Sequence, residues 1–277
     1  MSQDEKFFQF PLCLLTYGAT VKDRCNAIIR YCLIHEGLKA VDRIDIPKAK
    51  ELLAEMGERK PYGCDIKNRT DRAYLVGANV LNVVGGSVPD AVNTHGDVSA
   101  YCREYEAATQ GRDAQVRIKT SLIFETRDGS YDARQFAVLC GLYSLIGSKP
   151  YPVVCRREVI ALRAYGYKSK AAMDAWNARR ANKEEKLLTV DQIRYTLDAL
   201  EVSGWFARVQ ASKRNVYFSH RMTREQMLMK LANKIRIKAK PAINRAEERD
   251  FFQGLGLNRC PVIKAGNPDA GDASNAV

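Results

Sequence analysis

The sequence has few of the residues and motifs on which metal-dependent and ATP-hydrolysing enzymes rely. It contains 3 histidines, His35, His95 and His220, and none stands in an H-x-H or H-E-x-x-H pattern. A zinc hydrolase or a histidine-metal nickase is therefore disfavoured. No complete G-x-x-x-x-G-K-[ST] loop occurs, which argues against a P-loop ATPase, and no G-x-S-x-G occurs either. We accordingly predict no catalytic residues, no metal site and no cofactor.

Long apolar runs and paired cysteines are also absent. No segment approaches the length of a membrane span, and the start MSQDEKFFQF lacks the layout of a signal peptide. The 8 cysteines form no C-x-x-C pair, and most stand in apolar surroundings such as FPLCLLTY. Buried, reduced thiols explain them better than disulfides. We therefore expect a soluble cytoplasmic protein that has no contact with a membrane.

One pair of tyrosines resembles a catalytic motif without its chemistry. Tyr101 and Tyr105 form a Y-x-x-x-Y pair, which would place both phenols on one face of a helix. Some rolling-circle nickases use such a pair as nucleophiles. Because the histidine metal site is missing, the phosphate would have no electrophile beside it, and we predict that these tyrosines are not catalytic.

Positive charge is abundant, and it is concentrated in the second half of the chain. Residues 1–131 hold 18 basic and 18 acidic side chains, whereas residues 132–277 supply the whole net charge of +12. Between Trp205 and Lys240 the only acid is Glu225. This asymmetry favours a polyanionic partner for the C-terminal half.

The stretch 189–220 has the clearest local pattern. Thr189 and a glutamine three residues later fit a capping box, and Ile193, Leu197 and Leu200 fall on one face of the helix that would follow. Gly204 is placed to end this helix. Beyond it, the pattern predicts two strands, over 205–209 and 216–218, joined by the basic turn 211–215.

The remaining chain predicts further helices and one more strand. Apolar spacing favours helices over 19–37, 46–57, 74–84, 98–110, 132–147, 156–165 and 223–240, and the basic stretch 168–180 is either a further helix or an ordered loop. The alternation in 115–125 favours a strand, and 151–154 could supply a short one. The last helix has an apolar stripe of Met227, Leu231 and Ile235. The small, polar tail is expected to be largely disordered.

In order, 132–220 therefore gives helix, short strand, helix, an insertion, helix, strand, basic turn and strand. This layout resembles the winged-helix DNA-binding superfamily, and a basic chain of this size resembles plasmid and phage replication initiators. The resemblance implies a recognition helix at 189–203, a wing at 211–216, and duplex DNA as the partner. We expect an α+β, mainly helical fold: a mainly helical N-terminal domain over 1–112 for dimerisation or a protein contact, a winged-helix-like domain over 113–240, and a tail over 241–277.

Under this hypothesis the protein is a non-enzymatic DNA-binding protein, either a replication initiator or a transcription regulator. The candidate DNA-binding residues combine the recognition helix, the wing and basic neighbours: Arg156, Arg157, Lys168, Lys170, Gln192, Arg194, Tyr195, Lys213, Arg214, Arg221 and Arg224. Two alternatives stay open. One is a metal-dependent nuclease component with its active site in 60–131, and the other is a winged-helix module that binds protein.

Overall fold

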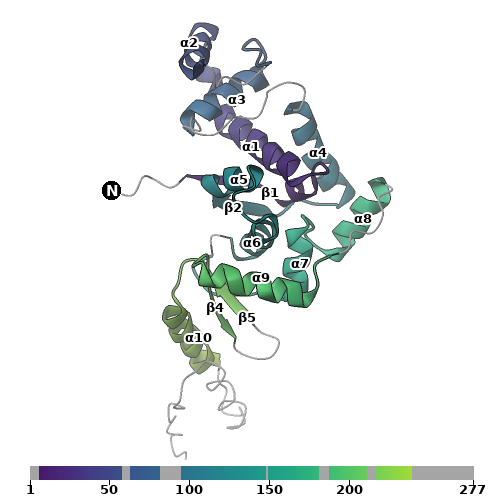
Figure 1. Cartoon of the computed structure of the whole chain (residues 1–277), viewed down its shortest axis with the longest axis vertical. Helices are drawn as coiled ribbons and strands as arrows, with labels where there is room; N and C mark the ends of the chain where they lie inside the picture. The colour runs from purple at the N-terminus through teal and green to yellow at the C-terminus, as the bar shows by residue number, and fades with distance from the viewer. Residues whose placement is uncertain are drawn as a thin grey trace, which may run out of the picture.

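The computed structural model describes residues 6–57, 63–81, 95–147, 149–180, 187–210 and 216–238. These residues form a mainly helical α+β structure with two small antiparallel sheets, which confirms the predicted class. In Figure 1 the elements follow one another along the long axis, from α2 and α3 at one end to α10 at the other. No helix in these ranges combines the length and apolar content that crossing a bilayer requires.

The first sheet joins two strands that are far apart in the sequence. β1 (Phe7–Pro11) pairs antiparallel with β2 (Gln115–Lys119), in a register that places Phe7 opposite Lys119. Phe8 and Ile118 are buried, whereas the alternate side chains on both strands point away from the core. The predicted domain boundary at 112 lies just before β2, so this sheet ties the two predicted ranges together.

The strand expected over 115–125 is only half as long in the structure. It ends at Lys119, and α5 (Thr120–Arg127) follows directly. From Leu122 on, the buried positions are Leu122, Ile123, Thr126 and Arg127, a spacing that fits one face of a helix and not one face of a strand. The prediction was wrong there because tertiary burial selects the helical period.

The described part of the N-terminal half also contains the α-helices α1 (Val21–Leu38), α2 (Ile46–Met56), α3 (Arg69–Val80) and α4 (His95–Ala108) and the short 3-10 helices η1 (Leu12–Thr16) and η2 (Val41–Arg43). α1 and α3 pack so closely that glycine is required at the contact. A Cβ on Gly37 would lie 1.6 Å from the carbonyl oxygen of Ala73, and one on Gly77 would lie 1.9 Å from that of Leu33. The two backbones therefore touch directly, with no side chain between them.

The predicted buried thiols are confirmed for most of the cysteines. Among the described residues seven cysteines are reduced, six of them buried and Cys64 half-buried, while Cys260 lies outside the described residues. Burial raises the pKa of Cys25 and of Cys155 to about 12, so these thiols stay protonated and act as small apolar side chains.

The C-terminal half begins with α6 (Ala133–Ile146) and continues through β3 (Val153–Val154), α7 (Arg157–Ala164), α8 (Lys170–Arg180), α9 (Val190–Val202), β4 (Ala207–Gln210) and β5 (Val216–Ser219). The three strands pair in the order β3-β5-β4, so the short strand joins the hairpin through β5. α6 also packs on β2, and one hydrophobic core runs from Phe8 through α6 to Phe218.

The last described helix, α10 (Arg224–Lys238), packs on β4. Its predicted apolar stripe is confirmed at Met227 and Leu231, which are buried with Val209 in a small separate cluster. The side chain of Ile235 and the tail 241–277 lie outside the described residues.

Candidate nucleic-acid interface

The helix that we predicted to recognise DNA is fixed at both ends by local hydrogen bonds. At its start the hydroxyl of Thr189 accepts from the amide of Gln192 at 3.2 Å, and the Gln192 side chain accepts from the amide of Thr189 at 2.9 Å. At its end Gly204 adopts φ +76°, and its amide donates to Glu201, while the amide of Trp205 donates to Leu200. The capping box and the glycine stop are confirmed.

One face of α9 is buried and the other is exposed. Ile193, Leu197 and Leu200 lie in the core, as their spacing predicted. Tyr195 on the outer face is 64% exposed, and Val202 near the end of the helix is 90% exposed. α9 therefore presents Tyr195 and Val202 on its outer surface together with charged side chains.

The acids of α9 do not stand alone. The guanidinium of Arg208 on β4 contacts the carboxylate of Asp198 at 2.5 Å and that of Glu201 at 2.6 Å. Nearer the start of the helix, Arg194 lies 3.4 Å from Asp191 and 4.8 Å from the centre of the Tyr195 ring. Each acid that faces outward is therefore paired with an arginine, which offsets its repulsion toward phosphate.

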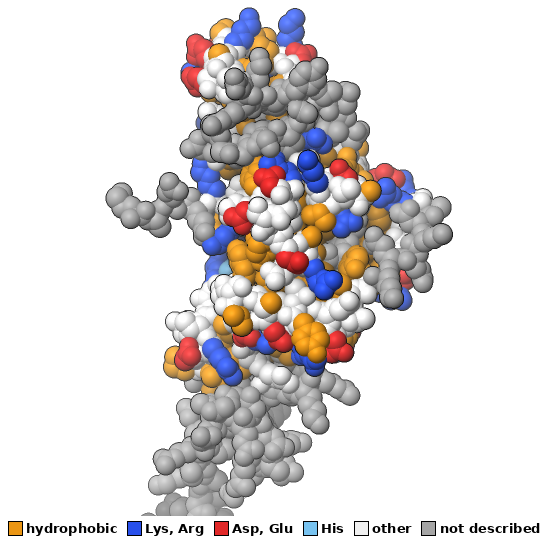
Figure 2. All heavy atoms as spheres, in the orientation of Figure 1, with side chains coloured by type: hydrophobic (Ala, Val, Ile, Leu, Met, Phe, Trp, Pro, Cys, Tyr) orange, Lys and Arg blue, Asp and Glu red, His pale blue; other side chains and the backbone are white. Residues whose placement is uncertain are grey.

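These arginines belong to a groove of about 380 Å³ beside α9. We call it the α9 groove, and it is lined by side chains from α7, α9, β4, β5 and α10: Arg157, Arg194, Asp198, Glu201, Arg208, Gln210, Val216 and Arg224. Four arginines against two carboxylates leave it positive. In Figure 2, basic and acidic side chains are close together on the surface at the level of α9.

The structure brings together some of the predicted residues and separates others. Arg157, Arg194 and Arg224 all line the α9 groove, and the ring of Tyr195 lies against Arg194 on α9. Gln192 is exposed, but its side-chain oxygen is engaged in the cap. Lys213 and Arg214, which we predicted to lie on a wing, are outside the described residues.

The other predicted basic residues lie elsewhere. Arg156 precedes the first turn of α7, and Lys170 begins α8. Lys168 donates to the carbonyl of Gly111 at 3.0 Å, next to the loop that follows α4. Arg221 lines a different pocket, between the two sheets.

The tyrosine pair lies in the core between α4 and α8. The Tyr105 hydroxyl donates to the carbonyl of Gly166 at 3.2 Å, and Tyr101 shares a hydrogen bond with Thr16 at 2.5 Å. Burial raises the pKa of Tyr101 to about 12, and it raises that of Tyr105 further, which is opposite to what a nucleophile needs. Across the described ranges, no three His, Cys, Asp or Glu side chains gather where they could hold a metal ion.

The chain matches no protein-family model, no curated protein and no solved structure. Its function is therefore argued from its own geometry.

Two features of the structure were not predicted from the sequence. Arg208 was one of many basic residues, and only the fold shows that it forms ion pairs with two acids. The second feature is the pocket that Arg221 shares with Arg117 and Lys119. The alternation of 115–119 places these two on one strand face, but the sequence does not show what that face meets.

Proposed function

We propose that the protein is a non-enzymatic DNA-binding protein whose α6–β5 unit is a winged helix. α9 would enter the major groove of duplex DNA, and 211–216 would act as the wing against phosphates. The observation that carries this proposal is the α9 groove, in which arginines from α7, β4 and α10 lie beside α9 and its own Arg194. The sheet order supports it as well, since β3 joins the hairpin, α6, α7 and α9 pack on one another, and Phe218 of β5 lies in the same core as these helices.

The ion pairs of Arg208 support the proposal on electrostatic grounds. Carboxylates on a recognition helix would repel phosphate if they stood alone. Here Arg208 pairs with both Asp198 and Glu201, and the four arginines that line the groove outnumber its two carboxylates, so the groove keeps a positive balance. Plasmid or phage replication initiation and transcription regulation both require this binding, and either role is consistent with it.

A protein-binding role is the second candidate, because Tyr195 and Val202 give α9 an exposed apolar component. It predicts weak DNA binding that does not change when Arg194 is removed.

The experiment is fluorescence anisotropy with labelled random duplex and single-stranded DNA, at two salt concentrations and with or without Mg²⁺. We expect tight duplex binding that weakens steeply with salt, because each neutralised phosphate releases counterions. The variant Arg157→Ala should bind more weakly, and the control Arg103→Ala, an exposed arginine on α4, should bind like the wild type. Absence of duplex binding at low salt would overturn the proposal, and Mg²⁺-dependent cleavage would favour a nuclease.

A further inference from the structure

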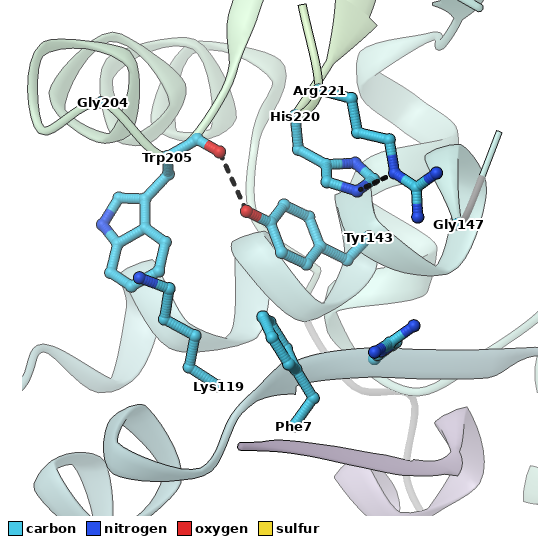
Figure 3. A pocket seen from close by; sticks show the side chains of 9 residues that line it. Phe7, Lys119, Tyr143, Gly147, Gly204, Trp205, His220 and Arg221 are labelled. Carbon is cyan, nitrogen blue, oxygen red and sulfur yellow. Dashed lines mark hydrogen bonds between the residues drawn. The ribbon is translucent and has the colours of Figure 1, made fainter. Parts of the chain in front are cut away.

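A second pocket, of about 420 Å³, lies where the two sheets approach each other. Its lining comes from five places in the chain: β1, β2, the end of α6, the turn between α9 and β4, and the residues after β5. Figure 3 shows the side chains converging on one space. No residue lines both this pocket and the α9 groove.

The walls of the pocket combine aromatic rings with cations. Its aromatic wall consists of Phe7, Tyr143 and Trp205, and its basic rim consists of Arg117, Lys119 and Arg221. His220 and two glycines complete the lining, and none of these nine described residues is acidic. The volume falls within the range of about 300–1,000 Å³ that is typical of small-ligand sites.

The rings and cations are held in place by contacts with one another. The Arg117 guanidinium lies 4.9 Å from the centre of the Phe7 ring, and the Lys119 ammonium lies 5.4 Å from that of Trp205. The Tyr143 hydroxyl donates to the carbonyl of Trp205 at 2.9 Å, which fixes the turn that carries the indole (Figure 3). The wall and the rim are thus arranged before any ligand arrives.

The pocket concentrates positive charge without an acid in its lining. Burial lowers the pKa of His220, and the nearby charges of Arg221 and Arg117 lower it further. In the lining of the α9 groove, two carboxylates offset the arginines. A bound anion would relieve the repulsion in the pocket, and a flat aromatic group on that anion would use the rings.

We propose that this pocket binds a nucleotide, with the base against the aromatic wall and the phosphate on the basic rim. The nucleotide could be free or one unit of a single strand, since both offer the same base and phosphate. Stacking of bases on aromatic side chains tolerates any sequence, whereas the cations track the phosphate. The site is additional to the duplex-binding surface proposed above and does not depend on it.

Isothermal titration calorimetry on the full chain tests this proposal with four probes: 5′-AMP, adenosine, inorganic phosphate and a ten-nucleotide single strand. We expect 5′-AMP to bind about tenfold or more tightly than adenosine or phosphate, because only AMP engages both wall and rim. A single strand that binds more tightly than AMP identifies a strand unit as the occupant, and equal affinity identifies a free nucleotide. If AMP produces no binding heat at millimolar concentration, the proposal is overturned.

Two variants separate the roles of rim and wall. Arg117→Gln with Arg221→Gln changes exposed side chains and should weaken AMP binding about tenfold or more while adenosine binding stays unchanged. Trp205→Leu should weaken both AMP and adenosine. AMP binding by the double variant at wild-type strength would overturn the proposal. Arg157→Ala should leave AMP binding intact, so failure of duplex binding and failure of this site can be distinguished.

Discussion

The two halves of the molecule use their residues in opposite ways. In the N-terminal half, α1 and α3 bring backbone against backbone through Gly37 and Gly77, and the charges of residues 1–131 balance. In the C-terminal half, α9 turns a polar face outward, and arginines from several elements gather beside it. Backbone contact at a glycine also occurs in the C-terminal half, where a Cβ on Gly141 would lie 2.6 Å from the amide nitrogen of Ala164, but it is tightest between α1 and α3. The contrast is therefore between the tightest helix packing in the N-terminal half and the surplus of positive charge in the C-terminal half. Each variant below tests one side of that contrast.

The largest effect is expected from Gly77→Ala in the N-terminal half. The new Cβ would lie 1.9 Å from the carbonyl oxygen of Leu33, so α1 and α3 must move apart. We expect the free energy of unfolding to fall by about 3 kcal/mol or more, measured by urea denaturation. The control is Gly129→Ala, where the added Cβ would have no atom within 4 Å. Only the left-handed backbone, at φ +81°, would be strained there, so we expect the free energy of unfolding to fall by about 1 kcal/mol. Equal losses for both variants would contradict the close approach.

The next largest effect is expected from Arg208→Ala in the C-terminal half, on the affinity for duplex DNA. Arg208→Ala would leave Asp198 and Glu201 without their shared partner, so duplex affinity should fall about tenfold or more, measured by anisotropy. Because these groups are partly exposed, we expect a loss of only about 1 kcal/mol in the free energy of unfolding. Adding Asp198→Asn and Glu201→Gln should restore part of the DNA affinity. No recovery would mean that Arg208 contacts DNA itself and does not act by neutralising acids.

A smaller and more selective effect distinguishes the helix from the wing. Arg194→Ala should relax the preference among DNA sequences, because under the proposed function its guanidinium would contact base edges. Lys213→Ala with Arg214→Ala should weaken binding to all duplexes and reduce the salt slope by about one unit per lost phosphate contact. Binding measured on several duplexes across a salt series separates the two outcomes. Equal loss in both variants would contradict the assignment of α9 to the groove of DNA.

The smallest expected effect is a pH dependence of the free energy of unfolding, which arises from His220 where the two halves meet. His220 packs against the Tyr143 ring at 5.3 Å, and burial together with Arg221 and Arg117 lowers its pKa below the ordinary 6.5. As pH falls, His220 therefore takes up a proton in the unfolded chain before it does so in the folded protein. The stabilisation that neutral His220 gives the folded protein is complete above about pH 7 and is lost as the pH drops below 6.5. Since the imidazole is half-exposed, screening keeps the change below about 1 kcal/mol. Urea denaturation of His220→Gln between pH 7.5 and 5.5 should show a flatter dependence than the wild type, and an identical dependence would exclude His220 as its source.

Much of the local structure was predictable because it depends on neighbours in the sequence. The capping box at Thr189, the glycine stop at Gly204 and the apolar stripe of α9 all involve residues within a few positions of one another. The stripe of α10 was confirmed at Met227 and Leu231 for the same reason. The prediction of a strand over 115–125 was wrong after Lys119, because the burial of Leu122 and Ile123 is set by distant elements.

The sequence by itself determined the mainly helical class, the unequal distribution of charge and the helix–hairpin order of 189–220, since period, composition and capping are local properties. Only the tertiary structure decided that β1 pairs with β2, that Gly37 and Gly77 bring two helices into contact, and that Arg208 pairs with Asp198 and Glu201. It alone also brought Phe7, Lys119 and Trp205 around one pocket. These arrangements join residues that are up to about two hundred positions apart, and the geometry of such contacts is set by packing of the whole core and not by any local pattern.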